Sequence, residues 1–128
     1  MMAIDQAWQS VQQLLAMMRQ CGGSDMFITA DFSPAIKRDG KMTPLSEQII
    51  SADLSRTLVL STMNERQRQE FLQTNECNFA ISVAGIGRFR VSAFVQQGRV
   101  GMVISSISLG IGRDGGEEEW LEETQELP

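Results

Sequence analysis

The sequence predicts an α+β fold in which helices pack on an antiparallel sheet, and three observations lead to this prediction. Apolar residues near the amino terminus recur every three to four positions, which predicts an amphipathic helix over residues 4–20. Residues 85–104 alternate between apolar and polar side chains on either side of Gln97-Gly98, which predicts a β-hairpin. The order of elements groups strands together between helices instead of alternating the two, and this grouping indicates an antiparallel sheet.

The first group of strands follows the amino-terminal helix. Gly22-Gly23 ends that helix, because glycine adopts the left-handed conformation at a helix end without steric cost. A short strand is predicted over residues 26–29. Asp39-Gly40 predicts a tight turn between a strand at 35–38 and a returning strand at 41–43.

Two further helices are predicted before the last strands. Ser51 is a typical N-cap residue for the first of them. The buried side of this helix is predicted from Leu54, Leu58 and Met63. Asn64 and Gln67 have the spacing of a capping box and begin the second helix. A strand over residues 76–83 then leads into the 85–104 hairpin.

Length and composition limit the class of protein. A chain of 128 residues, 42% of them hydrophobic, suggests a single domain with a modest core. No signal peptide opens the chain and no apolar run approaches the roughly 20 residues that cross a bilayer. The chain has no histidine, and Cys21 and Cys77 are its only cysteines, so we expect no metal site and two reduced thiols in a cytoplasmic protein.

Charge divides the chain into two parts. Residues 1–112 hold ten basic and nine acidic residues, a net charge of +1, whereas residues 113–128 hold one basic and seven acidic residues, a net charge of −6. We therefore predict a folded domain over 1–108 and a glycine-rich, then acidic, disordered tail over 109–128. Trp120-Leu121 is the hydrophobic spot of this tail and a candidate for docking on a neighbouring molecule.

The candidate functional residues lie on the 85–104 hairpin. Phe89 and Val91 alternate with Arg88 and Arg90, so both arginines are predicted on the strand face that points away from the core. Two interpretations follow from the pattern. The arginines either keep an edge strand solvated or form a cationic face for an anionic partner.

The hairpin register separates these arginines from a third. If Gln97-Gly98 is a two-residue turn, Arg90 lies opposite Ser105. Arg99 is then six residues along the ladder from Arg90, roughly 20 Å at about 3.3 Å per residue. A single phosphate group cannot bridge that distance, so Arg90 and Arg88 are the candidates for one anion site and Arg99 is a turn or interface residue.

No catalytic residue is predicted. The glycine-rich run GIGRDGG lacks the lysine of a phosphate-binding loop, and no nucleophile has a recognisable base. Asp25 and Asp39 are predicted at turns, where such side chains commonly bond the local backbone, so we assign both a structural role.

Two long runs of the sequence resemble one family. RQCGGSDMFITADFSPAIKRDGKMTPL and ECNFAISVAGIGRFRVSAFVQQGRVGMVI are similar to the opening region of the PilT/PilU family, the type IV pilus retraction ATPases of twitching motility. The resemblance covers about residues 12–104, and ECNFAIS and VQQGRVGMV are closer to the PilU branch. It implies a PAS-like amino-terminal domain of a hexameric motor, located in the cytoplasm at the inner face of the inner membrane.

The resemblance also implies the chemistry of the parent protein. This sequence has no Walker motif or RecA-like ATPase domain, so the chain alone is expected to be non-catalytic and to hold no cofactor, whereas the parent ATPase uses ATP and Mg²⁺. The expected partners are the RecA-like ATPase domain of the same or a neighbouring subunit and the pilus retraction machinery. Nucleic acid is not an expected partner, and no membrane span is expected. In the family this domain lends arginines to the nucleotide, and Arg90 falls on one of them, with Arg88 and Arg99 as weaker candidates. A second family arginine falls where this chain has Ser105-Ser106, and restoring arginine at Ser105 is expected to strengthen the site.

Two functions are weighed on this basis. The leading hypothesis is an assembly and regulatory domain that packs on a neighbouring ATPase domain and lends arginine to its nucleotide site. The alternative is a free-standing PAS-like sensor of a small ligand, which needs an interior pocket. Six apolar residues are expected to fill that interior, namely Ile28, Phe79, Ile81, Val91, Ala93 and Met102. This expectation favours the assembly role.

Overall fold

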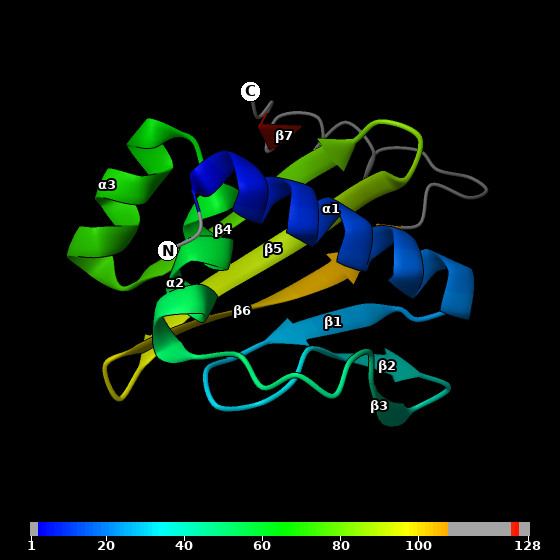
Figure 1. Ribbon diagram of the computed structural model, residues 1–128. Helices are drawn as coiled ribbons and strands as arrows, with labels where there is room; N and C mark the ends of the chain where they lie inside the picture. Colours follow the sequence, from blue (N-terminus) through cyan, green and yellow to red (C-terminus); the bar gives the residue numbers. More distant parts are fainter. Residues whose placement is uncertain (1–2, 108–123, 126–128) are drawn as a thin grey trace.

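The fold is a single, mainly antiparallel sheet with α1 and α2 on one face (Figure 1). The computed structural model describes residues 3–107 and 124–125. The helices are α1 (Ile4–Cys21), α2 (Ala52–Ser61) and α3 (Glu65–Thr74). The strands are β1 (Asp25–Ile28), β2 (Ala35–Arg38), β3 (Lys41–Pro44), β4 (Glu76–Val83), β5 (Gly87–Gln96), β6 (Arg99–Ser106) and β7 (Thr124–Gln125). The predicted α+β, PAS-like class with helices packed on an antiparallel sheet is confirmed.

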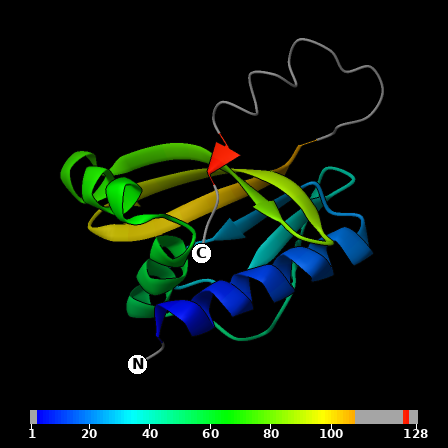
Figure 2. The same cartoon turned by 90° about the horizontal axis from the view of Figure 1, so that it is seen from above.

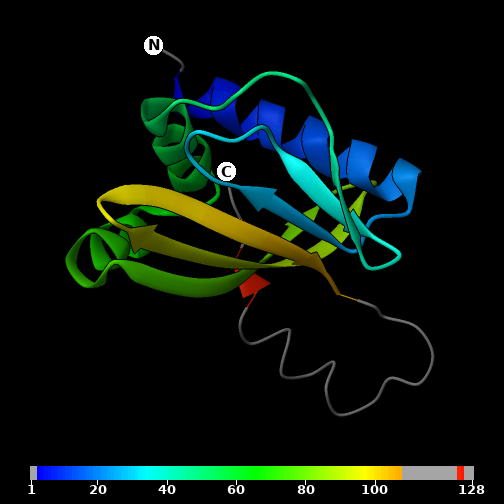
Figure 3. The ribbon, with the colours of Figure 1, turned by 90° about the horizontal axis from the view of Figure 1, so that it is seen from below.

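The sheet order is β3-β2-β1-β6-β5-β4-β7, so β1 lies beside the last long strand. Every neighbouring pair is antiparallel except β4 and β7, which run parallel. Figures 2 and 3 show α1 and α2 on the same side of the sheet, and α3 lies toward one end, against β4. We call the side without these helices the outer face.

The core fills the space between the sheet and the helices. Helix α1 buries one stripe of side chains at helical spacing, Ala7, Val11, Leu15 and Met18. The inner face of the hairpin supplies Phe89 and Val91 from β5 and Met102 and Ile104 from β6, all fully buried. The six residues predicted to fill the interior are buried, which confirms that prediction. Burial of this apolar surface is the main driving force of the fold.

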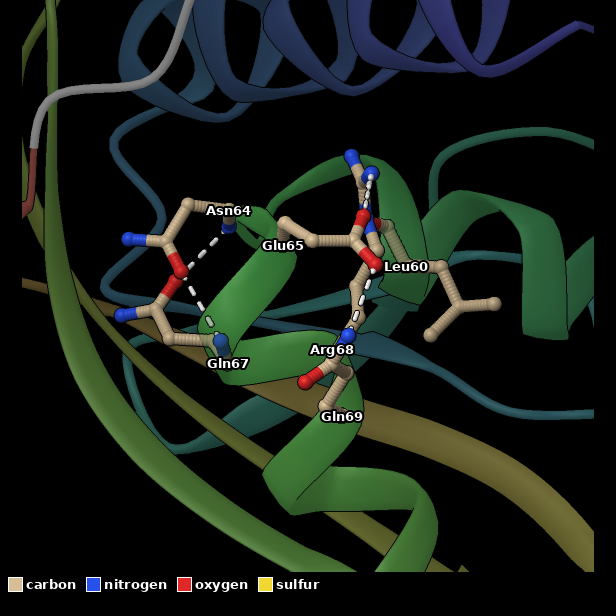
Figure 4. Close-up of polar contacts among 6 residues, drawn as sticks. All are labelled: Leu60, Asn64, Glu65, Gln67, Arg68 and Gln69. Atoms are coloured by element: carbon tan, nitrogen blue, oxygen red, sulfur yellow. Dashed lines mark hydrogen bonds and ion pairs between the residues drawn. The ribbon is translucent and has the colours of Figure 1, made fainter.

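Local signals fix the helix ends. The Ser51 hydroxyl accepts a hydrogen bond from the Leu54 amide at 3.1 Å, as expected of an N-cap. At α3 the Asn64 carboxamide accepts from the Gln67 amide at 2.8 Å, and the Gln67 carboxamide accepts from the Asn64 amide at 2.9 Å (Figure 4). This reciprocal pair is the predicted capping box.

The predicted extent of the second helix was wrong at its carboxyl end. Met63 is buried, but α2 ends at Ser61 and Met63 lies beyond it. The last carbonyls of α2 accept side-chain hydrogen bonds instead. The Thr62 hydroxyl donates to the Val59 carbonyl at 2.7 Å. Arg68 Nε donates to the Leu60 carbonyl at 2.9 Å (Figure 4). These bonds let the chain turn directly into α3.

The strands are close to their predicted bounds. Two of them, 35–38 and 76–83, coincide with the prediction, while the first begins one residue earlier, at Asp25. Both predicted tight turns are present. The central residues of the two turns have φ values of 53° and 78° at Asp39-Gly40 and 55° and 77° at Gln97-Gly98. Positive φ at both central positions is the geometry of hairpin turns that match the strand twist.

Part of the carboxyl-terminal sequence lies outside the described residues. The predicted tail over 109–128 is described only at β7, whose Thr124 and Gln125 pair with Ala80 and Ile81. Within the part of the chain that the structure describes, no helix is long and apolar enough to cross a membrane.

Candidate functional site

The candidate site is a row of polar residues that crosses the outer face of the sheet. Strand pairing aligns Lys37 with Asp25, Asp25 with Ser105, and Ser105 with Arg90. These four residues come from β2, β1, β6 and β5, and each has a buried neighbour in its own strand, namely Ile36, Met26, Ile104 and Phe89. We call them the polar row. Their order alternates a cation, an anion, a hydroxyl and a second cation.

Asp25 is held at the centre of the polar row by two hydroxyl groups. The Ser105 Oγ donates to Asp25 Oδ2 at 2.8 Å, and the Ser24 Oγ donates to Asp25 Oδ1 at 2.6 Å. The structural role predicted for Asp25 is therefore supported, but its partners are side chains, and one of them lies 80 residues away in the sequence. Because both carboxylate oxygens accept hydrogen bonds, Asp25 fixes the position of the Ser105 hydroxyl.

Arg88 and Arg90 occupy the predicted face of β5. Phe89 and Val91 are fully buried on the inner face, so the two arginines between and before them point outward. Arg90 is exposed and Arg88 is half-buried. They are two positions apart, about 7 Å along the strand, and are close enough to approach one anion.

Arg99 is separate from this pair, as the register predicted. It pairs with Gln96 beside the hairpin turn. Arg88 lies near the other end of β5. Its guanidinium forms an ion pair with Asp31, which follows β1 and has a φ of 73°. Arg99 therefore ties the hairpin turn to the β1–β2 connection instead of joining the polar row.

The two cysteines differ in environment. Both thiols are free, Cys21 being exposed at the end of α1 and Cys77 buried on β4. Burial raises the pKa of the Cys77 thiol above its usual 9.0, and the negative charge of Glu70 raises it further. Cys77 is thus a neutral core residue at physiological pH.

The polar row can bind an anion but has no group positioned for chemistry. A guanidinium offers a planar set of donors that matches phosphate or carboxylate oxygens. The sequence predicted Arg90 and its position opposite Ser105, whereas it missed Asp25 and Lys37 as members of the same row. The sequence signal for Asp25 and Lys37 was weak, because no local pattern in a short strand near the amino terminus indicates that it pairs with the last long strand.

No family model matches the chain. Two curated proteins of Pseudomonas aeruginosa are similar to it. The type IV pilus ATPase PilU is 49% identical over 100 residues, covering 78% of this chain and 26% of PilU. The type IV pilus retraction ATPase PilT is 32% identical over 97 residues, covering 76% of this chain and 28% of PilT. The chain therefore spans about a quarter of the length of these relatives.

A solved structure is similar in fold as well as in sequence. The crystal structure of the pilus retraction motor PilT with bound ADP superimposes with a TM-score of 0.74 at 28% identity. The similarity covers 80% of this chain and 30% of the PilT chain. Most of this chain thus corresponds to about a quarter to a third of each of these larger proteins.

Proposed function

The chain belongs to the PilT/PilU family of type IV pilus ATPases and is more similar to PilU than to PilT. On this premise we propose that it acts as a non-catalytic assembly and regulatory domain of a pilus retraction motor. In this proposal the outer face of the sheet packs against a RecA-like ATPase domain of the same or a neighbouring subunit. Arg90, assisted by Arg88, contacts the phosphates of the nucleotide held there.

The observation that carries the proposal is the exposure of Arg90 on the outer face beside a fixed hydroxyl. Its neighbours Phe89 and Val91 anchor β5 in the core, so the backbone that presents Arg90 is rigid. A charge-assisted hydrogen bond between a guanidinium and phosphate is stronger than a neutral one, and its planar donors favour a defined geometry. An exposed arginine on an anchored strand suits a phosphate that is bound mainly by another domain.

The alternative function, a free-standing sensor of a small ligand, receives less support. A PAS-like sensor needs space between the sheet and its helices. Here that space holds fully buried side chains, including Phe89, Met102 and Leu15. A ligand in the interior would have to displace them, and close-packed interiors resist such changes.

The remaining properties of the motor extend the same proposal. The assembled protein would be a hexamer, would act in the cytoplasm at the inner face of the inner membrane, and would use ATP and Mg²⁺ in its ATPase domain. The bound ADP of the similar PilT motor supports a nucleotide as the ligand. The retraction machinery of the pilus is the proposed wider partner.

The test joins this region to an ATPase domain, by replacing the equivalent region of P. aeruginosa PilU with residues 1–107 of this chain. Replacing Arg90 with alanine removes a contact worth about 1.5–3 kcal/mol. Binding or turnover of ATP should fall by roughly one to two orders of magnitude, since about 1.4 kcal/mol corresponds to tenfold. Arg90→Lys should recover part of the loss, because lysine keeps the charge but not the planar donors.

The matched control is Arg66→Ala, which removes an exposed arginine from α3 and should leave turnover unchanged. Thermal unfolding of each variant separates a functional effect from a structural one. If Arg90→Ala melts earlier and hydrolyses ATP normally, Arg90 is a structural residue and the nucleotide proposal fails.

A further inference from the structure

The polar row contains a hydroxyl group whose only proton is already donated within the row. Ser105 Oγ donates to Asp25 Oδ2 at 2.8 Å, and this hydrogen bond joins β6 to β1. A serine hydroxyl has one proton to donate and two lone pairs that accept. Ser105 therefore offers only lone pairs to any other neighbour, so it can accept a hydrogen bond there but cannot donate one.

The other direct neighbour of Ser105 across the sheet is Arg90. Strand pairing places Asp25 on one side of Ser105, in β1, and Arg90 on the other side, in β5. Side chains that lie directly opposite each other on one face of an antiparallel pair have Cβ atoms about 4.5–5.5 Å apart. A guanidinium only donates hydrogen bonds, so an acceptor at this distance suits Arg90. A hydroxyl that pointed its proton at the guanidinium would repel it.

Asp25 can fix the direction of the Ser105 proton because its own position is fixed. Its second carboxylate oxygen, Oδ1, accepts from Ser24 Oγ at 2.6 Å. Met26, the next residue of β1, is fully buried and anchors this strand in the core. Hydrogen bonds to an ionised carboxylate are roughly twice as strong as neutral ones, so the Ser105 proton stays on the side of Asp25.

We propose that Asp25 is a positioning residue for Arg90, which it orients through the Ser105 hydroxyl. Without Asp25 the hydroxyl is free to rotate, and the guanidinium loses a fixed acceptor. Arg90 then occupies more rotamers, and fewer of them face a bound phosphate. This inference rests on the proposed function for the phosphate contact, whereas the orientation of Arg90 can be measured on this chain alone.

Charge alone predicts the opposite effect of removing Asp25. The strands of Asp25 and Arg90 are two spacings apart, about 10 Å at about 4.8 Å each. A carboxylate at that distance repels a phosphate only weakly, because salt screens exposed charges over about 8–10 Å. Its removal would thus leave the affinity for phosphate unchanged or raise it slightly. Positioning predicts a lower affinity, so the sign of the change separates the two explanations.

Nitrogen relaxation of the Arg90 Nε–H group in the full chain tests the orientation directly. The order parameter of this group should be higher in the wild-type chain than in Asp25→Ala or Ser105→Ala. Ser105→Thr should restore it, because threonine keeps the hydroxyl. Glu76→Ala is the matched control, since Glu76 is an exposed carboxylate on β4, which is not adjacent to the strand of Ser105. Equal order in the wild-type chain and both alanine variants would overturn the proposal.

The PilU chimera described above tests the consequence for nucleotide. Asp25→Ala should weaken ATP binding by about three- to tenfold, the effect of losing about one hydrogen bond, and Glu76→Ala should not. The loss should vanish in an Arg90→Ala background, because the effects of residues that act through one another do not add. Thermal unfolding of each variant confirms that it is folded at the assay temperature.

The outcomes separate this inference from the proposed function. If Arg90→Ala leaves ATP binding unchanged, the proposed function fails, and the relaxation measurement alone decides whether Asp25 orients Arg90. If Arg90→Ala weakens ATP binding but Asp25→Ala leaves it unchanged or tighter, the positioning role of Asp25 is overturned. A loss from Asp25→Ala that persists in full in the Arg90→Ala background would overturn it equally, because Asp25 would then act on the structure in general.

Discussion

At the scale of single residues, the hydroxyl of Ser105 determines how the polar row is organised. It donates to Asp25 at 2.8 Å in a half-buried position and lies opposite Arg90. Replacing Ser105 with alanine leaves one carboxylate oxygen without this donor, and hydrogen bonds to charged groups are worth about 1.5–3 kcal/mol when well sheltered. We expect a loss of about 1–2 kcal/mol, seen as a Tm lower by about 4–9 °C.

Ser92→Ala provides the control for this measurement. Ser92 is exposed on the same outer face of β5, opposite Val103, and its replacement should change stability by less than about 0.5 kcal/mol. Equal losses in the two variants would show that the hydroxyl of Ser105 has no special role.

The same hydrogen bond changes what an arginine at position 105 would do. The sequence led us to expect that arginine there would strengthen an anion site beside Arg90. Asp25 is the direct neighbour of position 105 on the other side, and its carboxylate would attract the new guanidinium. The introduced guanidinium would then interact with both Asp25 and any bound anion. It would therefore raise the affinity for the anion by less than its charge alone suggests.

At the scale of elements, the two tight hairpins differ in how well their sequences suit their turns. Asp39-Gly40 has the residue types preferred at two positive φ positions, whereas Gln97 adopts a φ of 55° without a short side chain that bonds locally. Gln97→Asn should therefore raise the free energy of unfolding by about 0.5–1 kcal/mol. Urea unfolding measures this change.

Gln96→Asn is the comparison for the turn substitution. Gln96 is the last residue of β5 and has an extended backbone, where asparagine is disfavoured, so this change should not stabilise the protein. A gain of similar size in both variants would mean that the turn geometry is not the cause.

Local elements were predictable because their signals are local. The capping box at Asn64, the two tight turns and the alternation along β4 each depend on residues within a few positions of one another. The end of α2 was not predictable in the same way. It depends on Arg68, which reaches back from α3 to the Leu60 carbonyl, and that contact forms only when the two helices meet.

At the scale of the whole molecule, the arrangement of strands was the least predictable feature. The pairing of β1 with β6 brings Asp25 to Ser105 across 80 residues, and no periodicity in either segment encodes it. The candidate site was accordingly predicted in part. Arg88, Arg90 and Ser105 followed from the register of a single hairpin, whereas Asp25 and Lys37 joined the row only through the long-range pairing.

The exposure of Arg90 leads to a last prediction, which concerns the isolated chain and ATP. Arg90 is exposed and Arg88 is half-buried, and water competes strongly for a phosphate at an exposed arginine. The sequence also contains no GxxxxGK[ST] loop that would bind phosphates.

We therefore expect the isolated chain to bind ATP no more tightly than about the millimolar range and to release no phosphate above a buffer blank. Titration calorimetry and a steady-state phosphate assay check both expectations, with Arg90→Ala as the control. Turnover by the wild-type chain that Arg90→Ala abolishes would contradict the assignment of a non-catalytic domain, because it would require the outer face to complete a nucleotide site without an ATPase domain.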